Sequence, residues 1–286
     1  MNLSTFFRNF IQQLQQIYSA HEAANITDMC FEKIASITKS DLIKNPDLNL
    51  SAIHIKNLEA ALAELLLHKP VQYVLGEAWF YKLKFKVDES VLIPRPETEE
   101  LVNEVFDFIK YNSSKKIIDI GTGSGCIPIS IKKEFPESSI TAIDVDENAI
   151  AIASENATTH QTEINFVQMN FLDKNNWNVF EKFDIVISNP PYIPVAEKEM
   201  MDKNVTSFEP HLALFVPNEQ PLLFYEAIAL FSKTHLAENG KIFMEVHENL
   251  AREVADLFSQ HQFQTEIKKD IFEKERMVMA THYRLL

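Results

Sequence analysis

The sequence predicts an α/β fold in which a doubly wound, mostly parallel sheet follows a small all-α domain and a β-hairpin linker. The first observation is the alternation, from Lys115 onward, of apolar strand-like runs with helical segments. Such alternation is typical of a parallel sheet covered by helices on both faces. The second is the helical spacing of apolar residues near the N-terminus. The predicted strands are KKIIDI, SITAIDV, INFVQM, FDIVISN and KIFMEV.

Periodicity also predicts the domain boundaries. Residues 3–18 place apolar side chains on one helical stripe, and helical patterns follow over 22–38 and 51–68, where Ser51 is placed to cap a helix. Residues 78–87, AWFYKLKFKV, and the stretch that follows them predict a hairpin or a short strand pair. The predicted domains are therefore 1–72, helical; 73–93, a β-hairpin linker; and 94–286, the α/β domain.

Composition restricts the cellular location that we expect. Of 286 residues, 46% are hydrophobic and 24% are charged, which is the balance of a soluble globular protein. No apolar run approaches the roughly 20 residues of a membrane span, and the N-terminus lacks the layout of a secretory signal. Cys30 and Cys126 are the only cysteines, which favours a reducing compartment. We expect a cytoplasmic protein with no membrane partner.

Charge and histidine spacing restrict the ligands. The formal net charge of −14 disfavours nucleic acid as a direct partner, because a duplex binder needs a basic face. The nine histidines show no ligand spacing such as H-x-x-x-H, so no metal site is expected. We therefore expect a small-molecule or protein substrate and no metal.

The sharpest motif is the segment KIIDIGTGSGC, which ends at Cys126. Its three glycines follow a predicted strand and precede a helix, where glycine lets the backbone approach a ligand closely. The spacing is G-x-G-x-G, whereas dinucleotide enzymes use G-x-G-x-x-G, and Cys126 occupies the place of their third glycine. A structural turn without a ligand is the alternative, which three glycines in five residues disfavour. The residues expected to bind a cofactor are Gly121, Thr122, Gly123, Ser124 and Gly125.

Residues that flank this loop are further cofactor candidates. Asp119 precedes the glycines, and Asp144 ends the next strand, where a carboxylate can accept both hydroxyls of a ribose. A helix N-cap is the alternative role for Asp144, although Asp146 suits that role better. Asn170 and Phe171 follow the third predicted strand, where an amide and an aromatic ring can meet an adenine. The alternative for Phe171 is a place in the core.

The tetrapeptide Asn189-Pro190-Pro191-Tyr192 follows the fourth predicted strand. Two prolines force the chain out of the sheet at its carboxyl end, where ligands bind in open α/β sheets. The Asn189 side-chain oxygen and the Pro190 carbonyl can accept both N–H groups of a planar amide or amine, and Tyr192 can offer a face for stacking. We expect Asn189, Pro190 and Tyr192 to be catalytic, and the alternative is an ordinary Asn-Pro turn.

Several segments resemble one enzyme family. A tetrapeptide of this kind after a G-x-G-x-G loop is typical of amino-group methyltransferases, including adenine-specific DNA enzymes. More specifically, Val91-Leu-Ile-Pro-Arg-Pro-Glu-Thr-Glu99, Pro70-Val-Gln-Tyr-Val-Leu-Gly76 and Phe208-Glu-Pro210 resemble segments of the HemK/PrmC family, whose members are protein-(glutamine-N(5)) methyltransferases. The resemblance covers nearly the whole chain and implies a Rossmann-like class I methyltransferase domain with a seven-stranded sheet.

The resemblance also implies a substrate and a cofactor. The cofactor would be S-adenosylmethionine, with S-adenosylhomocysteine as product, and the target would be the glutamine of the Gly-Gly-Gln motif in class 1 peptide-chain release factors. The helical domain would recognise that protein. By resemblance, the cofactor loop falls on the three glycines, the ribose-binding acid on Asp144 and the adenine-side aromatic on Phe171. The four residues from Asn189 to Tyr192, Pro191 included, would bind the target glutamine, and Asn189 would also lie against the cofactor.

The sequence departs from the family pattern in places and leaves alternatives open. Phe171 stands where tryptophan is common, and Asn170 replaces a usual aspartate. Methylation of the exocyclic amine of adenine is one alternative function, and a cofactor-binding interaction module is another. For Arg95, Glu97 and Glu99 we weigh an ion-paired brace between linker and catalytic domain against a role in closing the cofactor pocket.

Overall fold

The computed structural model describes residues 2–45, 48–110 and 115–283. It divides into two compact units. The helical unit comprises Met1–Glu77 with Asp202–Phe208, and the catalytic unit comprises Ala78–Met201 with Glu209–Leu286. Residue 1, where the predicted helical domain begins, and residue 286, where the predicted α/β domain ends, lie outside the described residues.

The helical unit confirms the predicted helical patterns and adds short helices between and after them. Its helices are α1 (Leu3–Leu14), α2 (Ala20–Ala35), α3 (Lys39–Lys44), α4 (Ala52–Leu66), α5 (Val71–Leu75) and, from its second segment, α9 (Lys203–Phe208). The first predicted helix ends earlier than expected, because Ser19 already caps the next one by accepting a hydrogen bond from the Glu22 N–H. Ser51 caps α4 as predicted, accepting from the His54 N–H.

Aromatic rings hold the core of the helical unit together. Phe31 on α2 is fully buried, and the rings of Phe6, Phe7 and Phe10 on α1 lie 5.9, 4.9 and 5.6 Å from it. Edge-to-face pairs of this kind stabilise a core by about 0.5–1.5 kcal/mol each beyond the area that they bury. The phenylalanine-rich N-terminus is therefore the apolar face of a packed helix.

The hairpin predicted over residues 78–87 forms, and it begins one residue earlier. Its strands are β1 (Glu77–Phe80) and β2 (Leu83–Lys86). Tyr81 and Lys82 between them both have positive φ, the geometry of a tight turn whose twist matches that of the two strands. The stretch after Asp88, which we also considered as a strand, contains none. Instead Asp88 Oδ1 accepts a hydrogen bond from the Ser90 N–H, which makes a turn.

The catalytic unit contains a seven-stranded sheet, as the family resemblance implied. The strand order is β10-β11-β9-β6-β3-β4-β5, and the strands are parallel except β11, which is antiparallel to both of its neighbours. The prediction from periodicity missed β10 and β11. The strands are β3 (Lys116–Ile120), β4 (Ser139–Asp144), β5 (Asn165–Gln168), β6 (Phe183–Ser188), β9 (Leu236–Glu245), β10 (Phe263–Lys269) and β11 (Glu275–His282).

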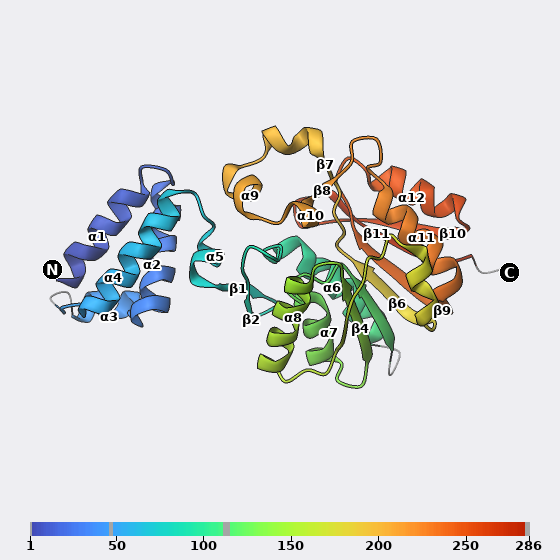
Figure 1. Cartoon of the computed structure of the whole chain (residues 1–286), viewed down its shortest axis with the longest axis horizontal. Helices are drawn as coiled ribbons and strands as arrows, with labels where there is room; N and C mark the ends of the chain where they lie inside the picture. The colour runs from blue at the N-terminus through green and yellow to red at the C-terminus, as the bar shows by residue number, and fades with distance from the viewer. Residues whose placement is uncertain (1, 46–47, 111–114, 284–286) are drawn as a thin grey trace. The chain divides into compact units, whose positions relative to one another are not determined.

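Helices cover both faces of this sheet, as Figure 1 shows. Alternate residues of each strand enter different cores: Ile117 belongs to one apolar cluster and Ile118 to the other, and Ile185 and Val186 divide in the same way. On one face lie α6 (Pro96–Ile109), α7 (Cys126–Glu134) and α8 (Glu147–Thr159); on the other lie α11 (Leu223–His235) and α12 (Ala251–Gln260). The predicted doubly wound architecture is therefore confirmed.

The remaining elements lie between β6 and α11 or after β5. They are η1 (Lys174–Val179), β7 (Ile193–Pro194), η2 (Val195–Met200), α9 (Lys203–Phe208), α10 (His211–Leu214) and β8 (Phe215–Val216). The strands β7 and β8 form a separate two-stranded parallel pair. The first strand of this pair, β7, follows the predicted tetrapeptide directly, so the chain leaves the main sheet at the point where the two prolines require it.

Candidate functional site

The candidate site lies where the direction of chain progression across the sheet reverses. β3 is central, with β4 and β5 on one side and β6 and β9 on the other. Ligands bind in open α/β sheets at such a switch point, outside the carboxyl ends of the strands. The Ser188 hydroxyl at the end of β6 donates a hydrogen bond of 2.7 Å to the carbonyl of Ile120 at the end of β3. This bond joins the two segments that carry the glycine loop and the tetrapeptide.

A cavity of about 340 Å³ opens at this point, a size within the usual range of small-molecule sites. Most of the residues predicted for the site line it, and three do not: Asp119, Gly125 and Tyr192. The predicted residues in its wall are Gly121, Thr122, Gly123, Ser124, Asp144, Asn170, Phe171, Asn189, Pro190 and Pro191. Other residues in the wall include Arg95, Thr98 and Cys126.

The glycine loop is tied to the neighbouring strand and leaves its backbone open to the cavity. The N–H groups of Gly121 and Thr122 both donate to the carbonyl of Ile143, at 2.9 and 3.0 Å. Gly121 and Gly123 have φ of +77° and +52°, and a Cβ on either would meet no atom within 4 Å. Residues with a side chain rarely adopt this φ. Glycine at these positions allows the turn and also leaves the space beside the backbone free, so that a ligand can approach the loop.

Gly125 has a different role. Its φ is also +77°, but a Cβ there would lie 3.1 Å from the side chains of Ala153 on α8 and Ile129 on α7. The third glycine therefore allows two helices to pack closely and does not line the cavity. Our expectation that all three glycines face a ligand does not extend to Gly125, because the chain has already turned into α7 at that residue.

Asp144 is held at the cavity wall by backbone donors. Its carboxylate accepts hydrogen bonds from the N–H groups of Gly123, at 2.9 Å, and of Asp146, at 3.1 Å. Burial raises its pKa above the ordinary value for aspartate, and these backbone donors oppose that shift. Asp146, not Asp144, caps α8, as we expected. The two bonds fix the carboxylate while leaving it capacity to accept further donors.

The loop region contains buried polar atoms that have no hydrogen-bond partner among the described residues. They are both carboxyl oxygens of Asp119 and the hydroxyl oxygens of Thr122 and Ser124. Such atoms are costly to bury unpaired. Burial raises the pKa of Asp119 to about 7; the nearby Thr122 hydroxyl opposes this shift, and the charge of Asp144 adds to it. Together with the open space above Gly121 and Gly123, these atoms fit a ligand that carries polar groups.

Phe171 belongs both to the cavity wall and to the core. It is 5% exposed, and its ring lies 5.4 Å from those of Trp177 and Phe231. The Trp177 indole N–H donates to the Phe171 carbonyl at 2.8 Å. Neighbouring Asn170 uses its side-chain oxygen to accept from the Leu172 N–H. Phe171 is therefore fixed in place by packing, with the remaining part of its surface facing the cavity.

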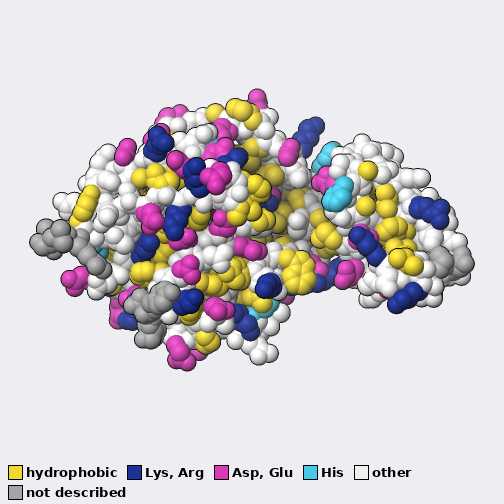
Figure 2. Space-filling model, turned by 180° about the vertical axis from the view of Figure 1, so that it is seen from behind, with side chains coloured by type: hydrophobic (Ala, Val, Ile, Leu, Met, Phe, Trp, Pro, Cys, Tyr) yellow, Lys and Arg dark blue, Asp and Glu magenta, His cyan; other side chains and the backbone are white. Residues whose placement is uncertain are grey.

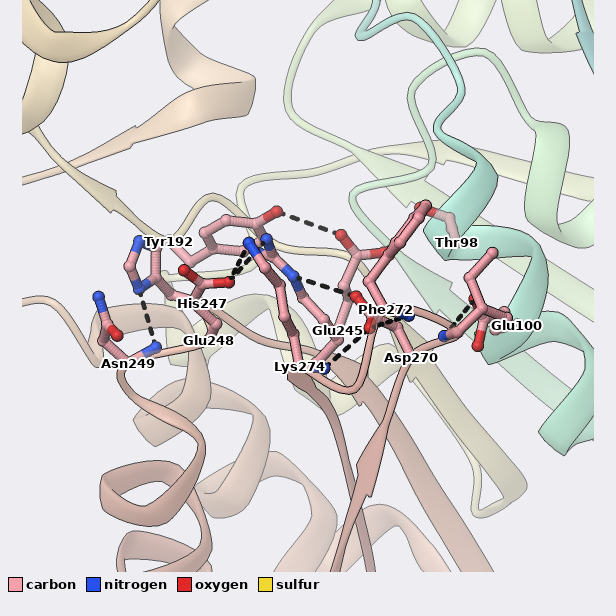
Figure 3. A network of polar contacts seen from close by, with 12 residues as sticks. Thr98, Glu100, Tyr192, Glu245, His247, Glu248, Asn249, Asp270, Phe272 and Lys274 are labelled. Atoms are coloured by element: carbon pink, nitrogen blue, oxygen red, sulfur yellow. Dashed lines mark hydrogen bonds and ion pairs between the residues drawn. The ribbon is translucent and has the colours of Figure 1, made fainter.

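The tetrapeptide is connected to a buried network that the sequence did not reveal (Figure 3). The Asn189 side-chain amide donates to Thr98 Oγ1 at 3.0 Å, and the Thr98 hydroxyl donates to Glu245 Oε2 at 2.6 Å. The Tyr192 hydroxyl donates to Glu245 Oε1 at 3.2 Å. Tyr192 therefore lies beside the cavity, its ring in contact with that of His247 at 6.0 Å.

The segment that contains Thr98 is anchored by its charged residues. Arg95 lines the cavity, and its guanidinium lies 2.6 Å from both carboxyl oxygens of the buried Glu209. Glu99 accepts a hydrogen bond from the Tyr81 N–H of the hairpin at 2.8 Å. Arg95 therefore forms part of the pocket wall, and its ion pair lies within the predicted α/β domain and does not brace the linker. The contact from the linker to that domain is made by Glu99, through the Tyr81 N–H.

Cys126 lines the cavity, but its thiol is poorly suited to act as a nucleophile. Its side chain is 8% exposed, and burial raises the pKa of its thiol to about 12. A thiolate is the nucleophilic form of cysteine, and this environment disfavours it.

Among residues 2–45, 48–110 and 115–283, no group of three or more His, Cys, Asp or Glu side chains is arranged to hold a metal ion. Within the same part of the chain, no helix has the length and apolar character needed to cross a membrane.

Fold and site together define a class I methyltransferase. The family described as "Methyltransferase small domain" matches residues 100–208, and the one described as "PrmC N-terminal domain" matches residues 6–76. A "Release factor glutamine methyltransferase" of Flavobacterium psychrophilum is 40% identical over 282 residues, covering 97% of this chain and 98% of that protein. The chain belongs to the release factor glutamine methyltransferase family.

Further relatives agree with this assignment. A protein of the same name from Bacteroides thetaiotaomicron is 35% identical over 271 residues, covering 94% of this chain and 96% of that protein. Among solved structures, a methyltransferase from Pyrococcus furiosus has a TM-score of 0.50 at 16% identity, covering 78% of this chain and 98% of that one. At this identity the structural similarity supports the fold alone.

The raised pKa of Asp119 predicts a specific pH dependence of stability. Its folded pKa of about 7 lies above the roughly 3.9 of an unfolded aspartate, so stability is greatest below the lower value and declines as pH rises through the higher one. Between about pH 4 and pH 8, wild-type protein should lose about 2–4 kcal/mol more unfolding free energy than Asp119→Asn. Chemical denaturation at several pH values measures this difference.

The control for this prediction is Asp173→Asn. Asp173 is an exposed helix cap whose side chain accepts from the Asn175 N–H, and asparagine caps equally well. This variant should follow the wild-type pH curve. Identical curves for wild type and Asp119→Asn would show that Asp119 ionises without cost in the folded protein.

Gly121 and Gly125 offer a matched test of the glycine roles. Both have φ of +77°, but only Gly125 has neighbouring side chains at 3.1 Å. Gly121→Ala should cost about 1–2 kcal/mol of unfolding free energy through backbone strain, whereas Gly125→Ala should cost about 2–5 kcal/mol because overpacking is added. Equal losses in denaturant titrations would exclude the helix-packing role of Gly125.

Proposed function

We propose that this chain transfers the methyl group of S-adenosylmethionine to the side-chain amide nitrogen of the glutamine in the Gly-Gly-Gln motif of class 1 peptide-chain release factors. The observation that carries the proposal is the orientation of Asn189. Its NH2 group is used by Thr98, at 3.0 Å, at the wall of the cavity. The amide oxygen is thereby turned away from Thr98 and is left to accept hydrogen bonds from a substrate. The names of the relatives supply the protein substrate.

The cavity wall holds the residues that would bind the cofactor. The open backbone at Gly121 and Gly123 and the unpaired hydroxyls of Thr122 and Ser124 suit its polar amino acid end. Asp144 is placed for ribose hydroxyls, since its carboxylate is fixed by backbone donors and retains accepting capacity. Asn170 and Phe171 would meet the adenine. When bound, S-adenosylmethionine supplies an electrophilic methyl group.

The residues of the tetrapeptide act by orientation. An amide nitrogen is a poor nucleophile because its lone pair is delocalised. The Asn189 oxygen and the Pro190 carbonyl would accept its two N–H groups and thereby aim the nitrogen at the methyl carbon. Orientation of this kind can be worth about 7–11 kcal/mol in favourable systems. Acceptors already in place for the developing positive charge add electrostatic stabilisation.

A protein substrate fits this chain better than nucleic acid does. The exocyclic amine of adenine also presents a planar NH2 group, so the tetrapeptide alone does not discriminate between the two. The net charge of −14 disfavours a polyanion. On the face drawn in Figure 2, Lys and Arg side chains are interspersed with Asp and Glu. We propose that the helical unit recognises the release factor, and that the reaction takes place in the cytoplasm, which suits two free buried cysteines.

The decisive experiment uses labelled S-adenosylmethionine, a purified release factor and its Gln→Ala variant at the Gly-Gly-Gln motif. We expect label on the wild-type factor only. Label on both proteins would place the methyl group on another residue. Absence of label on both, together with label on adenine-containing nucleic acid, would favour the alternative function.

Asn189→Ala should lower kcat by about 100- to 10,000-fold, because it removes one of two groups that orient the nucleophile. Cofactor affinity should change by less than about tenfold, since the glycine loop and Asp144 remain in place. Calorimetric titration and single-turnover transfer measure the two quantities. Retained turnover in this variant would exclude Asn189 as an orienting group.

Cys126→Ser should keep kcat within about threefold of wild type, because direct transfer needs no thiolate and the thiol is protonated at neutral pH. Rapid-quench analysis should find no label on the enzyme during turnover. Label found on the wild-type enzyme and absent from Cys126→Ser would show that the methyl group passes through the cysteine.

A further inference from the structure

A chain of hydrogen bonds connects Asn189 to a buried carboxylate. Asn189 Nδ2 donates to Thr98 Oγ1, and Thr98 donates to Glu245 Oε2, over 3.0 and 2.6 Å. Thr98 lies in the first turn of α6 and is 3% exposed, and Glu245 ends β9 and is also 3% exposed. Figure 3 shows Thr98 and Tyr192 meeting Glu245 from different elements.

The direction of these bonds follows from the number of protons. A threonine hydroxyl has one proton and can also accept. The Thr98 hydroxyl gives its one proton to Glu245 Oε2. Thr98 Oγ1 can then only accept from Asn189, so the amide must turn its NH2 group toward Thr98. The amide oxygen therefore faces the opposite way.

The pKa of the buried Glu245 carboxyl is raised overall. Burial raises its pKa, whereas the hydroxyl donors Thr98 and Tyr192 and the positive charge of Arg276 oppose that shift. Both carboxyl oxygens are used, Oε2 by Thr98 and Oε1 by Tyr192. The Tyr225 hydroxyl also donates to the Glu245 main-chain carbonyl at 3.0 Å, which fixes the end of the strand.

We propose that Glu245 and Thr98 are positioning residues that set the hydrogen-bond polarity of Asn189, so that the site presents an acceptor and selects a target with N–H donors. The inference rests on the proposed function and deepens it, because it identifies what makes the site specific for an amide over a carboxylate. Glu245 acts through Thr98 and does not touch the substrate. Through Oε1 it also holds Tyr192, so one carboxylate organises two residues of the tetrapeptide.

The principal test compares Thr98→Val with Thr98→Ser at saturating S-adenosylmethionine. Valine keeps the shape and removes the hydroxyl, so the Asn189 amide is free to rotate, and kcat should fall by about 10- to 100-fold. Serine restores the hydroxyl and should bring kcat back to within about threefold of wild type. A wild-type kcat in Thr98→Val would overturn the proposal, as would a serine variant no better than the valine one.

The matched control is Thr27→Val in the helical unit. Thr27 is fully buried and donates to the Ala23 carbonyl at 2.7 Å. This substitution should lower thermal stability about as much as Thr98→Val does and leave kcat within about twofold of wild type. A fall in kcat equal to that of Thr98→Val would show that loss of stability, not polarity, explains the effect.

Two further measurements separate polarity from general damage. In the presence of S-adenosylhomocysteine, wild-type enzyme should bind the release factor at least about tenfold better than its Gln→Glu variant at the motif, and Thr98→Val should bring this ratio toward one. An unchanged ratio in Thr98→Val would overturn the proposal.

A double variant tests whether Glu245 and Thr98 act together. The fold-reduction in kcat of the double variant should be smaller than the product of the fold-reductions in Glu245→Gln and in Thr98→Val, since both substitutions act on Asn189. A fold-reduction in the double variant equal to that product would overturn the proposal.

Failure of this inference is distinguishable from failure of the proposed function. If wild-type enzyme does not methylate the release factor, the proposed function fails. If wild-type enzyme methylates the factor and Thr98→Val does so at the same rate, the proposed function stands. The proposed positioning of Asn189 by Thr98 and Glu245 then fails.

Discussion

The site depends on a topological constraint, which is that β3 and β6 lie side by side and end at the same edge while the chain proceeds from them to opposite sides of the sheet. The helices α7 and α11 that follow these strands cover different faces, which leaves room for a ligand beyond the strand ends. The bond from Ser188 to the Ile120 carbonyl holds the two ends together. The glycine loop and the tetrapeptide become neighbours for this reason, although far apart in sequence.

Two buried carboxyl groups near this crevice differ in their hydrogen bonding. Asp119 has no hydrogen-bond partner among the described residues, and burial raises its pKa to about 7. Glu245 is as deeply buried but receives two hydroxyl donors. An unpaired buried carboxyl destabilises the fold and leaves capacity for a ligand, whereas one that receives a donor on each oxygen rigidifies its neighbours. The first suits a binding wall, and the second suits a support for residues that must keep one orientation.

Segments from distant parts of the chain converge on Asn189. Thr98 belongs to the first turn of α6, Asn189 follows β6, and Glu245 ends β9. The start of α6 is fixed by Pro96 at its first turn and by the ion pair of neighbouring Arg95 with Glu209. Proline suits this position because it lacks the N–H that a helix start leaves unpaired. The hairpin adds a further anchor, through the bond from the Tyr81 N–H to Glu99.

The sequence by itself determined the N-terminal helices, the hairpin, five of the seven strands of the sheet and the family, because each depends on local periodicity or on contiguous motifs. It also located the loop and the tetrapeptide. It did not reveal β10 and β11, whose side chains alternate only partly between buried and exposed. Only the tertiary structure decided that Gly125 packs two helices, that Asp119 lies beneath the wall, and that Tyr192 is bonded to Glu245. The physical reason is that burial and hydrogen-bond direction depend on residues brought together across the sheet, and local spacing carries no record of them.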